Sequence, residues 1–208
     1  MDQNSISLRD AFTFARIKYK NHYLLFIAIM FTFFAIWVLL EIIVFAGQKL
    51  GIVFWAVAHL VFFMVFAGLQ VGFIQICLAV VEGRAVSYSN LFSSLSLGVR
   101  FFMAQLFYLA LCLVGFVLLI IPGFYWLTQY TMNGFCMAAH STDLLSSFQN
   151  SAQISKNSKF SLFILLMAII LLNLVGASLL GVGLFVTVPV SVLVKTYVFK
   201  QLESSAAS

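Results

Sequence analysis

A long, mainly apolar run over residues 101–139 contains the pair Pro122-Gly123 near its middle. A membrane-spanning helix needs roughly 20 apolar residues, so the run is about twice the length of one crossing. Because proline removes a backbone donor and glycine tolerates positive φ, this pair can interrupt a helix. We therefore expect a helical hairpin that turns at Pro122-Gly123. The alternative is one long helix kinked at Pro122, although tilt cannot absorb twice the required length.

The composition indicates the class of protein. Of the 208 residues, 63% are hydrophobic and 8% are charged, and the mean hydropathy is +1.12. Soluble domains contain about 25% charged residues, which cover their surfaces. We therefore expect an integral membrane protein with one transmembrane domain over residues 1–208 and no soluble catalytic domain. The N-terminal residues 1–23 are polar and basic, and they indicate a cytoplasmic amphipathic segment rather than a cleaved signal peptide.

The same length criterion divides the rest of the chain into membrane spans. It predicts an all-α, polytopic bundle of six transmembrane helices in three hairpins, with amphipathic helices at the interface. The expected spans are residues 24–46, 54–81, 101–121, 124–140, 160–178 and 184–200.

The basic residues predict an orientation. One set of loops and the two terminal segments contain Arg9, Arg16, Lys18, Lys20, Arg84, Arg100, Lys156, Lys159 and Lys200. Lys49 lies in the other set of turns. The positive-inside rule therefore places both termini in the cytoplasm. The net charge of +5 suits anionic lipid, and no motif for nucleic-acid binding accompanies it.

A polar, Ser-rich segment precedes each expected hairpin. In the third, STDLLSSFQNSAQISKNSK, Leu144, Leu145 and Phe148 share an apolar stripe that leaves Ser147 and Ser151 toward the other side. Such a helix would lie in the membrane plane. The expected contacts with lipid or a partner are Leu144, Leu145, Phe148, Lys156 and Lys159. An amphipathic connector without a binding role is the alternative.

The last two units match in detail, which predicts an internal repeat. LFSS at residues 91–94 corresponds to LLSS at residues 144–147, and Pro122 precedes Tyr130 by the same interval as Pro189 precedes Tyr197.

Three stretches also resemble a known family: LLIIPGFYWLTQY, SSFQNSAQISKNSKF and LLNLVGASLLGVGLFVTVPVSVLVKTYVFKQL. They are similar to a group of bacterial inner-membrane proteins of unknown function and to the membrane domain of some glycerophosphoryl diester phosphodiesterases. The resemblance implies a location in the bacterial inner membrane. The sequence has Gln129 where the phosphodiesterase-linked members lead us to expect arginine. It contains no catalytic barrel, so no phosphodiesterase activity is implied.

Polar residues within the spans offer little chemistry. No zinc, nucleophile-elbow or phosphate-loop motif is present, so we expect no enzyme activity and no cofactor or metal. Glu41, His59 and Asn173 form a candidate polar pathway, together with the amides Gln70, Gln75 and Asn133. The alternatives are a Glu41–Lys49 pair, a structural His59, and amides that join helices.

Small residues predict close helix packing. Gly68 and Gly72 form a GxxxG motif, and Gly176 and Gly181 lie in the last hairpin. Packing within the monomer and dimerisation are both compatible with this pattern.

These features predict a non-catalytic membrane module that binds lipid or a membrane-protein partner, or a further copy of itself, through its in-plane helices. A small transporter or channel that uses Glu41, His59 and Asn173 is the alternative, because many transporters derive from duplicated units.

Overall fold

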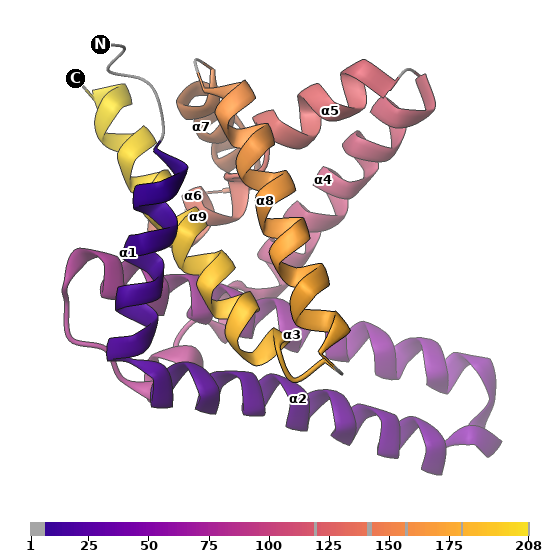
Figure 1. Ribbon diagram of the computed structural model, residues 1–208. Helices are drawn as coiled ribbons and strands as arrows, with labels where there is room; N and C mark the ends of the chain where they lie inside the picture. The colour runs from indigo at the N-terminus through magenta and orange to yellow at the C-terminus, as the bar shows by residue number, and fades with distance from the viewer. Residues whose placement is uncertain (1–6, 119, 141–142, 157, 180, 208) are drawn as a thin grey trace.

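The computed structural model describes residues 7–118, 120–140, 143–156, 158–179 and 181–207, and this part of the chain is helical without a strand. The expected all-α class is therefore confirmed. The α-helices are α1 (Leu8–Asn21), α2 (Tyr23–Ala46), α3 (Gly51–Glu82), α4 (Gly98–Leu118), α5 (Ile120–Gln129), α6 (Asn133–His140), α7 (Leu144–Ser155), α8 (Lys159–Ser178) and α9 (Leu184–Ala207) (Figure 1). The short 3-10 helices are η1 (Gln48–Leu50), η2 (Tyr88–Leu91) and η3 (Leu95–Leu97).

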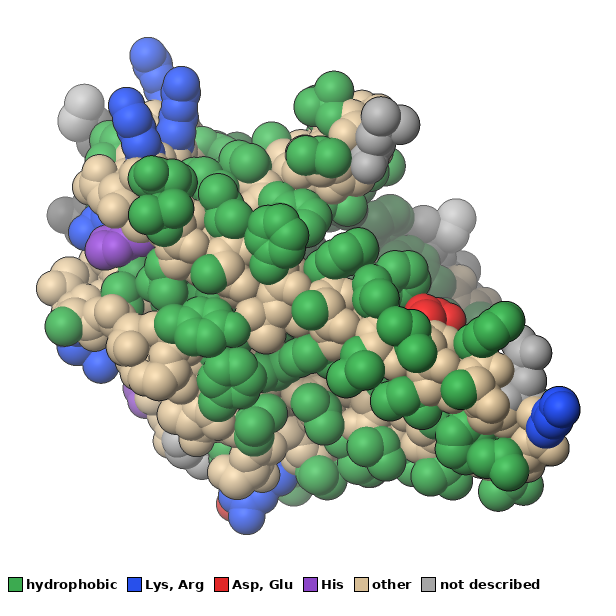
Figure 2. Space-filling model, turned by 90° about the horizontal axis from the view of Figure 1, so that it is seen from below, with side chains coloured by type: hydrophobic (Ala, Val, Ile, Leu, Met, Phe, Trp, Pro, Cys, Tyr) green, Lys and Arg blue, Asp and Glu red, His purple; other side chains and the backbone are tan. Residues whose placement is uncertain are grey.

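Within the described residues, five segments containing α2, α3, α4, α8 and α9 are long and apolar enough to cross a membrane. Their outer faces are strongly apolar: Phe45, Ile52 and Val117 are 73%, 79% and 85% exposed. Figure 2 shows hydrophobic side chains across the surface, with Lys and Arg toward the edges of the view. Soluble monomers rarely expose apolar surface of this extent, so the chain is a multi-pass membrane protein.

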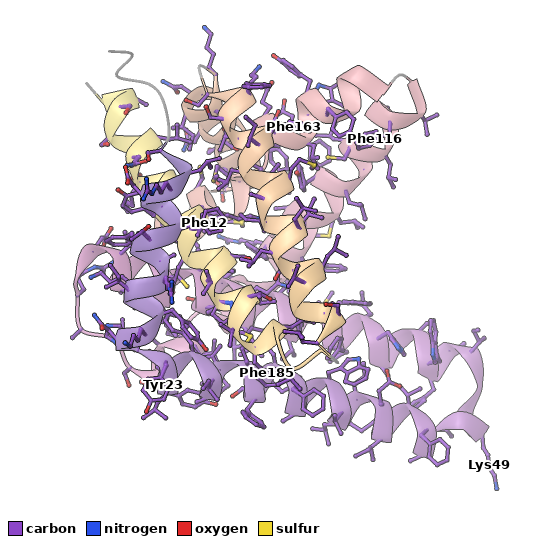
Figure 3. The ribbon with its side chains drawn as sticks, viewed as in Figure 1. Phe12, Tyr23, Lys49, Phe116, Phe163 and Phe185 are labelled. Carbon is purple, nitrogen blue, oxygen red and sulfur yellow. The ribbon has the colours of Figure 1, made fainter. Side chains whose placement is uncertain are left out.

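The long helices form pairs that diverge from a common centre (Figure 1). Helices α2 and α3 run side by side away from the other helices, and Lys49 lies at their far tip (Figure 3). Helices α4 and α5 form a second pair, and α8 and α9 form a third. The buried side chains of Phe26, Ile76 and Phe199 belong to the core that joins α2, α3 and α9.

The pair Pro122-Gly123 does not form the turn between α4 and α5. Both residues have helical backbone in the first turns of α5, where proline is tolerated because the first helical N–H groups have no intrahelical acceptor. Gly123 instead permits close packing, since a Cβ there would lie 2.5 Å from the Phe116 ring of α4. The two helices are antiparallel, and the link at residue 119 lies outside the described residues.

The expected fourth span, residues 124–140, is not one continuous helix. Helix α5 ends at Gln129, residues 130–132 form a turn, and α6 begins at Asn133. Neither α5 nor α6 is long enough to cross a membrane alone. The count of six spans is therefore not confirmed by helix length.

Gly68 and Gly72 pack within the monomer, against the irregular segment that leads into α4. A Cβ on Gly72 would lie 2.1 Å from the carbonyl oxygen of Leu91, and one on Gly68 would lie 2.9 Å from the Leu95 Cα. This segment forms the short helices η2 and η3, so the second Ser-rich segment is not the regular in-plane helix that its sequence predicts.

The glycines of the last hairpin have separate roles. Gly176 lies in the α8–α9 contact, where a Cβ would lie 2.4 Å from the Thr187 hydroxyl oxygen. Gly181, which we expected in the turn 181–183 and also at a helix contact, has φ +76° in the turn between these helices, and a Cβ there would meet nothing within 4 Å. Its conformation is one that glycine adopts without steric cost, so Gly181 is a turn residue.

Candidate functional site

A cavity of about 520 Å³ lies where the three helix pairs meet. Its described lining comes from seven α-helices and the turn between α5 and α6: Met30 and Phe33; Phe66, Gln70, Phe73 and Ile74; Phe101, Gln105 and Tyr108; Leu127; Thr131; Asn133, Gly134 and Phe135; Leu166; Val188, Val192 and Lys195. Pockets of this volume are typical of small-molecule sites, which are mostly apolar with a few placed polar groups.

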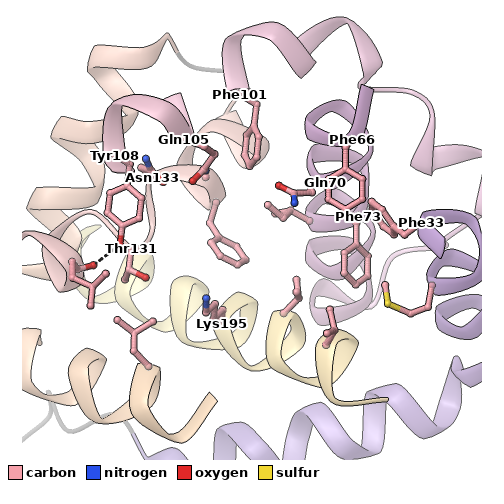
Figure 4. A pocket seen from close by; sticks show the side chains of 18 residues that line it. Phe33, Phe66, Gln70, Phe73, Phe101, Gln105, Tyr108, Thr131, Asn133 and Lys195 are labelled. Carbon is pink, nitrogen blue, oxygen red and sulfur yellow. Dashed lines mark hydrogen bonds between the residues drawn. The ribbon is translucent and has the colours of Figure 1, made fainter. Parts of the chain in front are cut away.

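Lys195 is the only charged side chain among the described residues that line the cavity. It lies near the middle of α9, and Figure 4 shows its amine directed into the cavity. It forms no hydrogen bond or ion pair with any described residue. A lysine at the centre of a membrane span costs about 3 kcal/mol, so such residues generally face a polar cavity or have a partner. Lys195 lines a cavity but has no partner in the described part of the chain.

The cavity has a polar side and an aromatic side (Figure 4). Gln105, Tyr108, Thr131 and Asn133 lie on the polar side. The side-chain nitrogen of Asn133 is buried and has no hydrogen-bond partner among the described residues. It is therefore an unsatisfied donor in the wall of the cavity.

Aromatic rings from α2 and α3 form the opposite side. Phe33 and Phe66 pack at 4.9 Å between ring centroids, and Phe33 and Phe73 at 6.1 Å, both in edge-to-face geometry. Gln70 lies among these rings and also lines the cavity. One side of the cavity is therefore rich in hydrogen-bond donors, and the opposite side is mainly aromatic.

The break between α5 and α6 lines the polar side, and other helices satisfy the carbonyls that it exposes. A helix end leaves its last four carbonyls without intrahelical donors. The Tyr108 hydroxyl donates to the Leu127 carbonyl at 2.8 Å, and the Ser151 hydroxyl donates to the Gln129 carbonyl at 2.9 Å. Non-helical backbone at membrane depth occurs where protein buries it or where it lines a cavity, and this break fits both conditions.

The residues of the predicted polar pathway are not brought together. The Glu41 side chain is exposed, and no ion pair with Lys49 occurs among the described residues. His59 lies against Trp55 and shares a hydrogen bond with its carbonyl oxygen at 2.9 Å. Asn173 donates to the Ser191 hydroxyl at 3.0 Å and so joins α8 to α9. None of the three is among the described residues that line the cavity.

The other predicted amides divide between the cavity and helix packing. Gln70 and Asn133 line the cavity. Gln75 instead donates to the Ala138 carbonyl at 3.2 Å and accepts from Ser94 at 2.5 Å, so it joins α3, α6 and the segment before α4. An amide side chain in a span can line a cavity or join two helices, and only the fold shows which of the two it does.

Helix α7 is present, but its faces differ from those expected. Ser147, Ser151 and Ser155 are fully buried, and Phe148 packs on Tyr130 with ring centroids 5.2 Å apart. Leu145 is 70% exposed. The serine face therefore contacts the bundle and does not face water.

The remaining predicted contacts of this region differ in accessibility. Leu144 is partly buried, and the Lys156 side chain is exposed. Lys159 lies 3.5 Å from the centroid of the Tyr125 ring and donates to the Gln129 side-chain oxygen at 3.2 Å. Phe148 and Lys159 are therefore engaged within the protein, whereas Leu145 and Lys156 remain accessible.

Lys195, Gln105, Tyr108 and Thr131 line the cavity but were not expected from the sequence, and Lys195 is the charged one among them. The available signal was a cation within the predicted span 184–200, because charged residues inside spans usually have a function. Comparison with family models, curated proteins and solved structures found no match. The structure itself defines the class: a multi-pass helical membrane protein with a central cavity that contains a lysine without a partner among the described residues.

Proposed function

We propose that this protein binds the negatively charged group of a membrane-soluble ligand in its central cavity, with Lys195 as the counter-charge. The supporting observation is a cation that lines the cavity and lacks a partner among the described residues. A buried ammonium that loses hydration without gaining a partner destabilises the fold, whereas an anion in the cavity would offset that cost. We propose a binding function without catalysis.

We also propose a topology of six crossings in which α5 and α6 together form the fourth. Residues 120–140 would extend about 30 Å with α5 and α6 placed end to end, which matches the hydrocarbon core. Six crossings place both termini on one side, and the basic residues favour the cytoplasm of a bacterial inner membrane. Leu145 and Lys156 would then contact lipid at the interface. We likewise propose that the chain is related to the family it resembles and that its last two units form an internal repeat.

A second candidate function is transport of the bound ligand. Broken helices beside a central site are common in secondary transporters, and the α5–α6 break is such a feature. Lys195, Gln105 and Asn133 would replace Glu41, His59 and Asn173 as the polar pathway. Saturable efflux from proteoliposomes, lost on Lys195→Met, would support transport beyond binding.

Binding can be tested with dodecyl phosphate, which is anionic at neutral pH, added to the full chain in nanodiscs of uncharged lipid. We expect saturable binding of dodecyl phosphate and none of dodecanol, which has the same chain without the charge. Lys195→Met should weaken binding at least tenfold, a loss equivalent to about 1.4 kcal/mol. Lys195→Arg, which keeps the charge, is the matched control and should bind. Equal binding by wild type and Lys195→Met would refute the proposal.

A further inference from the structure

We infer that the ligand of the central cavity is an anionic amphiphile with a single hydrocarbon chain, such as an alkyl phosphate or a fatty acid. This inference rests on the proposed function and specifies its ligand. It assigns the head group to Lys195, Gln105 and Asn133, and the chain to the rings of Phe33, Phe66 and Phe73.

The distribution of polar groups supports an amphiphile. An inorganic anion would need donors around its whole surface, whereas the described donors of this cavity lie mainly on one side (Figure 4). The aromatic side, formed by α2 and α3, suits a hydrocarbon chain. A ligand with one charged end and one apolar end matches both sides together.

The available donors suit an acidic head group. The Lys195 ammonium supplies up to three N–H donors, and the buried Asn133 amide nitrogen has no partner within the described residues. The Tyr108 hydroxyl already donates to the Leu127 carbonyl. Carboxylate and phosphate oxygens accept charge-assisted hydrogen bonds from such donors, and a cationic or zwitterionic head group would place positive charge beside Lys195.

The cavity volume limits the number of chains. A methylene group is similar in size to a water molecule, which occupies roughly 30 Å³ in the liquid. A volume of about 520 Å³ therefore holds roughly 17 such groups. One chain of about twelve carbons with a small head group fits within this limit, and only the end of a sixteen-carbon chain would extend beyond it. Most of the second long chain of a diacyl phospholipid would have to lie outside the cavity.

The inference is tested by displacement of labelled dodecyl phosphate from the full chain in nanodiscs. Hexadecyl phosphate and hexadecanoate should displace the probe. Dihexadecanoyl phosphatidate has a comparable phosphate head group with two chains and should be at least tenfold weaker at equal mole fraction in the bilayer. All three competitors reside in lipid, so hydrophobic partitioning does not explain the difference. Inorganic phosphate should not displace the probe at millimolar concentration.

A matched pair of variants locates the chain. Phe66 lines the cavity, whereas Phe63 on the same helix is exposed. We expect Phe66→Ala to weaken dodecyl phosphate binding several-fold and Phe63→Ala to leave it unchanged. Thermal unfolding of both variants shows whether any loss reflects misfolding, and a milder Phe66→Leu replaces Phe66→Ala if that variant is unstable.

The outcomes separate the inference from the proposed function. Equal displacement by phosphatidate and hexadecyl phosphate, or unchanged binding by folded Phe66 variants, overturns the single-chain inference. The proposed function still stands in that case if Lys195→Met abolishes binding. Loss of the Lys195 dependence overturns both.

Discussion

At the scale of single residues, Gly72 determines how closely the chain before α4 can approach α3. The carbonyl oxygen of Leu91 occupies the position that a Cβ on Gly72 would require, at 2.1 Å. This neighbour is backbone, so it cannot move aside as a side-chain end could. The GxxxG motif therefore accommodates an irregular segment, which its sequence alone does not indicate.

We predict that Gly72→Ala destabilises the protein by about 1–3 kcal/mol, the usual cost of overpacking. Thermal or denaturant unfolding in detergent measures the change. The control is Ala56→Leu, a larger apolar change at an exposed position of the same helix, which should have little effect. If Gly72→Ala unfolds with the wild-type midpoint, the close contact with Leu91 is wrong.

The residues of the cavity could be predicted only in part. Gln70 and Asn133 were expected as polar groups in spans, and both line the cavity. Lys195 could have been recognised as a charge within a span. Asn173 lies outside the cavity, where its amide joins two helices. The sequence could not predict this difference, because it depends on which neighbours the fold provides.

At the scale of elements, the α5–α6 break is the feature that the sequence indicates least clearly. Residues 124–140 contain no proline, and the turn-favouring pair Asn133-Gly134 at the start of α6 is the local signal. Tertiary contacts stabilise the break, because Tyr108 of α4 and Ser151 of α7 donate to carbonyls at the end of α5. The helical period of a sequence does not show which donors other helices supply. For the same reason, it does not show that the serine face of α7 is buried against other helices.

We predict that Ser151→Ala destabilises the protein by about 1–3 kcal/mol, because the Gln129 carbonyl loses its side-chain donor in a buried setting. Affinity for dodecyl phosphate should fall as well, since the break lines the cavity. Ser146→Ala is the matched control on the exposed side of α7 and should behave as wild type. Equal unfolding midpoints for the two variants would contradict the role assigned to Ser151.

At the scale of the whole molecule, residue pairs far apart in sequence join the helices on the side of the core opposite the tip of α2 and α3. Lys200 of α9 pairs with Glu82 of α3 at 2.8 Å and with Glu203 at 2.9 Å, and Glu203 in turn contacts His140 of α6 at 2.6 Å. The contacts hold the ends of three helices together while the helix pairs diverge elsewhere. The apolar spans were predictable from length and composition, but the divergence that creates the cavity was not.

We predict that single cysteines at positions 49 and 182 react with an impermeant reagent from outside the cell, and that cysteines at 156 and 204 do not. All four positions are exposed, and the native Cys77, Cys112 and Cys136 are buried and would be replaced first. Six crossings place 49 and 182 on the same side. If α5 and α6 do not cross, positions 156 and 204 become external and 182 becomes internal, which would contradict the proposed topology.

The most direct test of the central claim is native mass spectrometry of the full chain released from lipid nanodiscs prepared from its host membrane. Wild type and Lys195→Arg should retain one anionic, single-chain amphiphile per protein, identified by fragmentation of the adduct. Lys195→Met, with the same fold by circular dichroism, should lose that adduct. An adduct retained equally by Lys195→Met, or its absence from the wild-type protein, would contradict the assignment of the cavity as an anion-binding site.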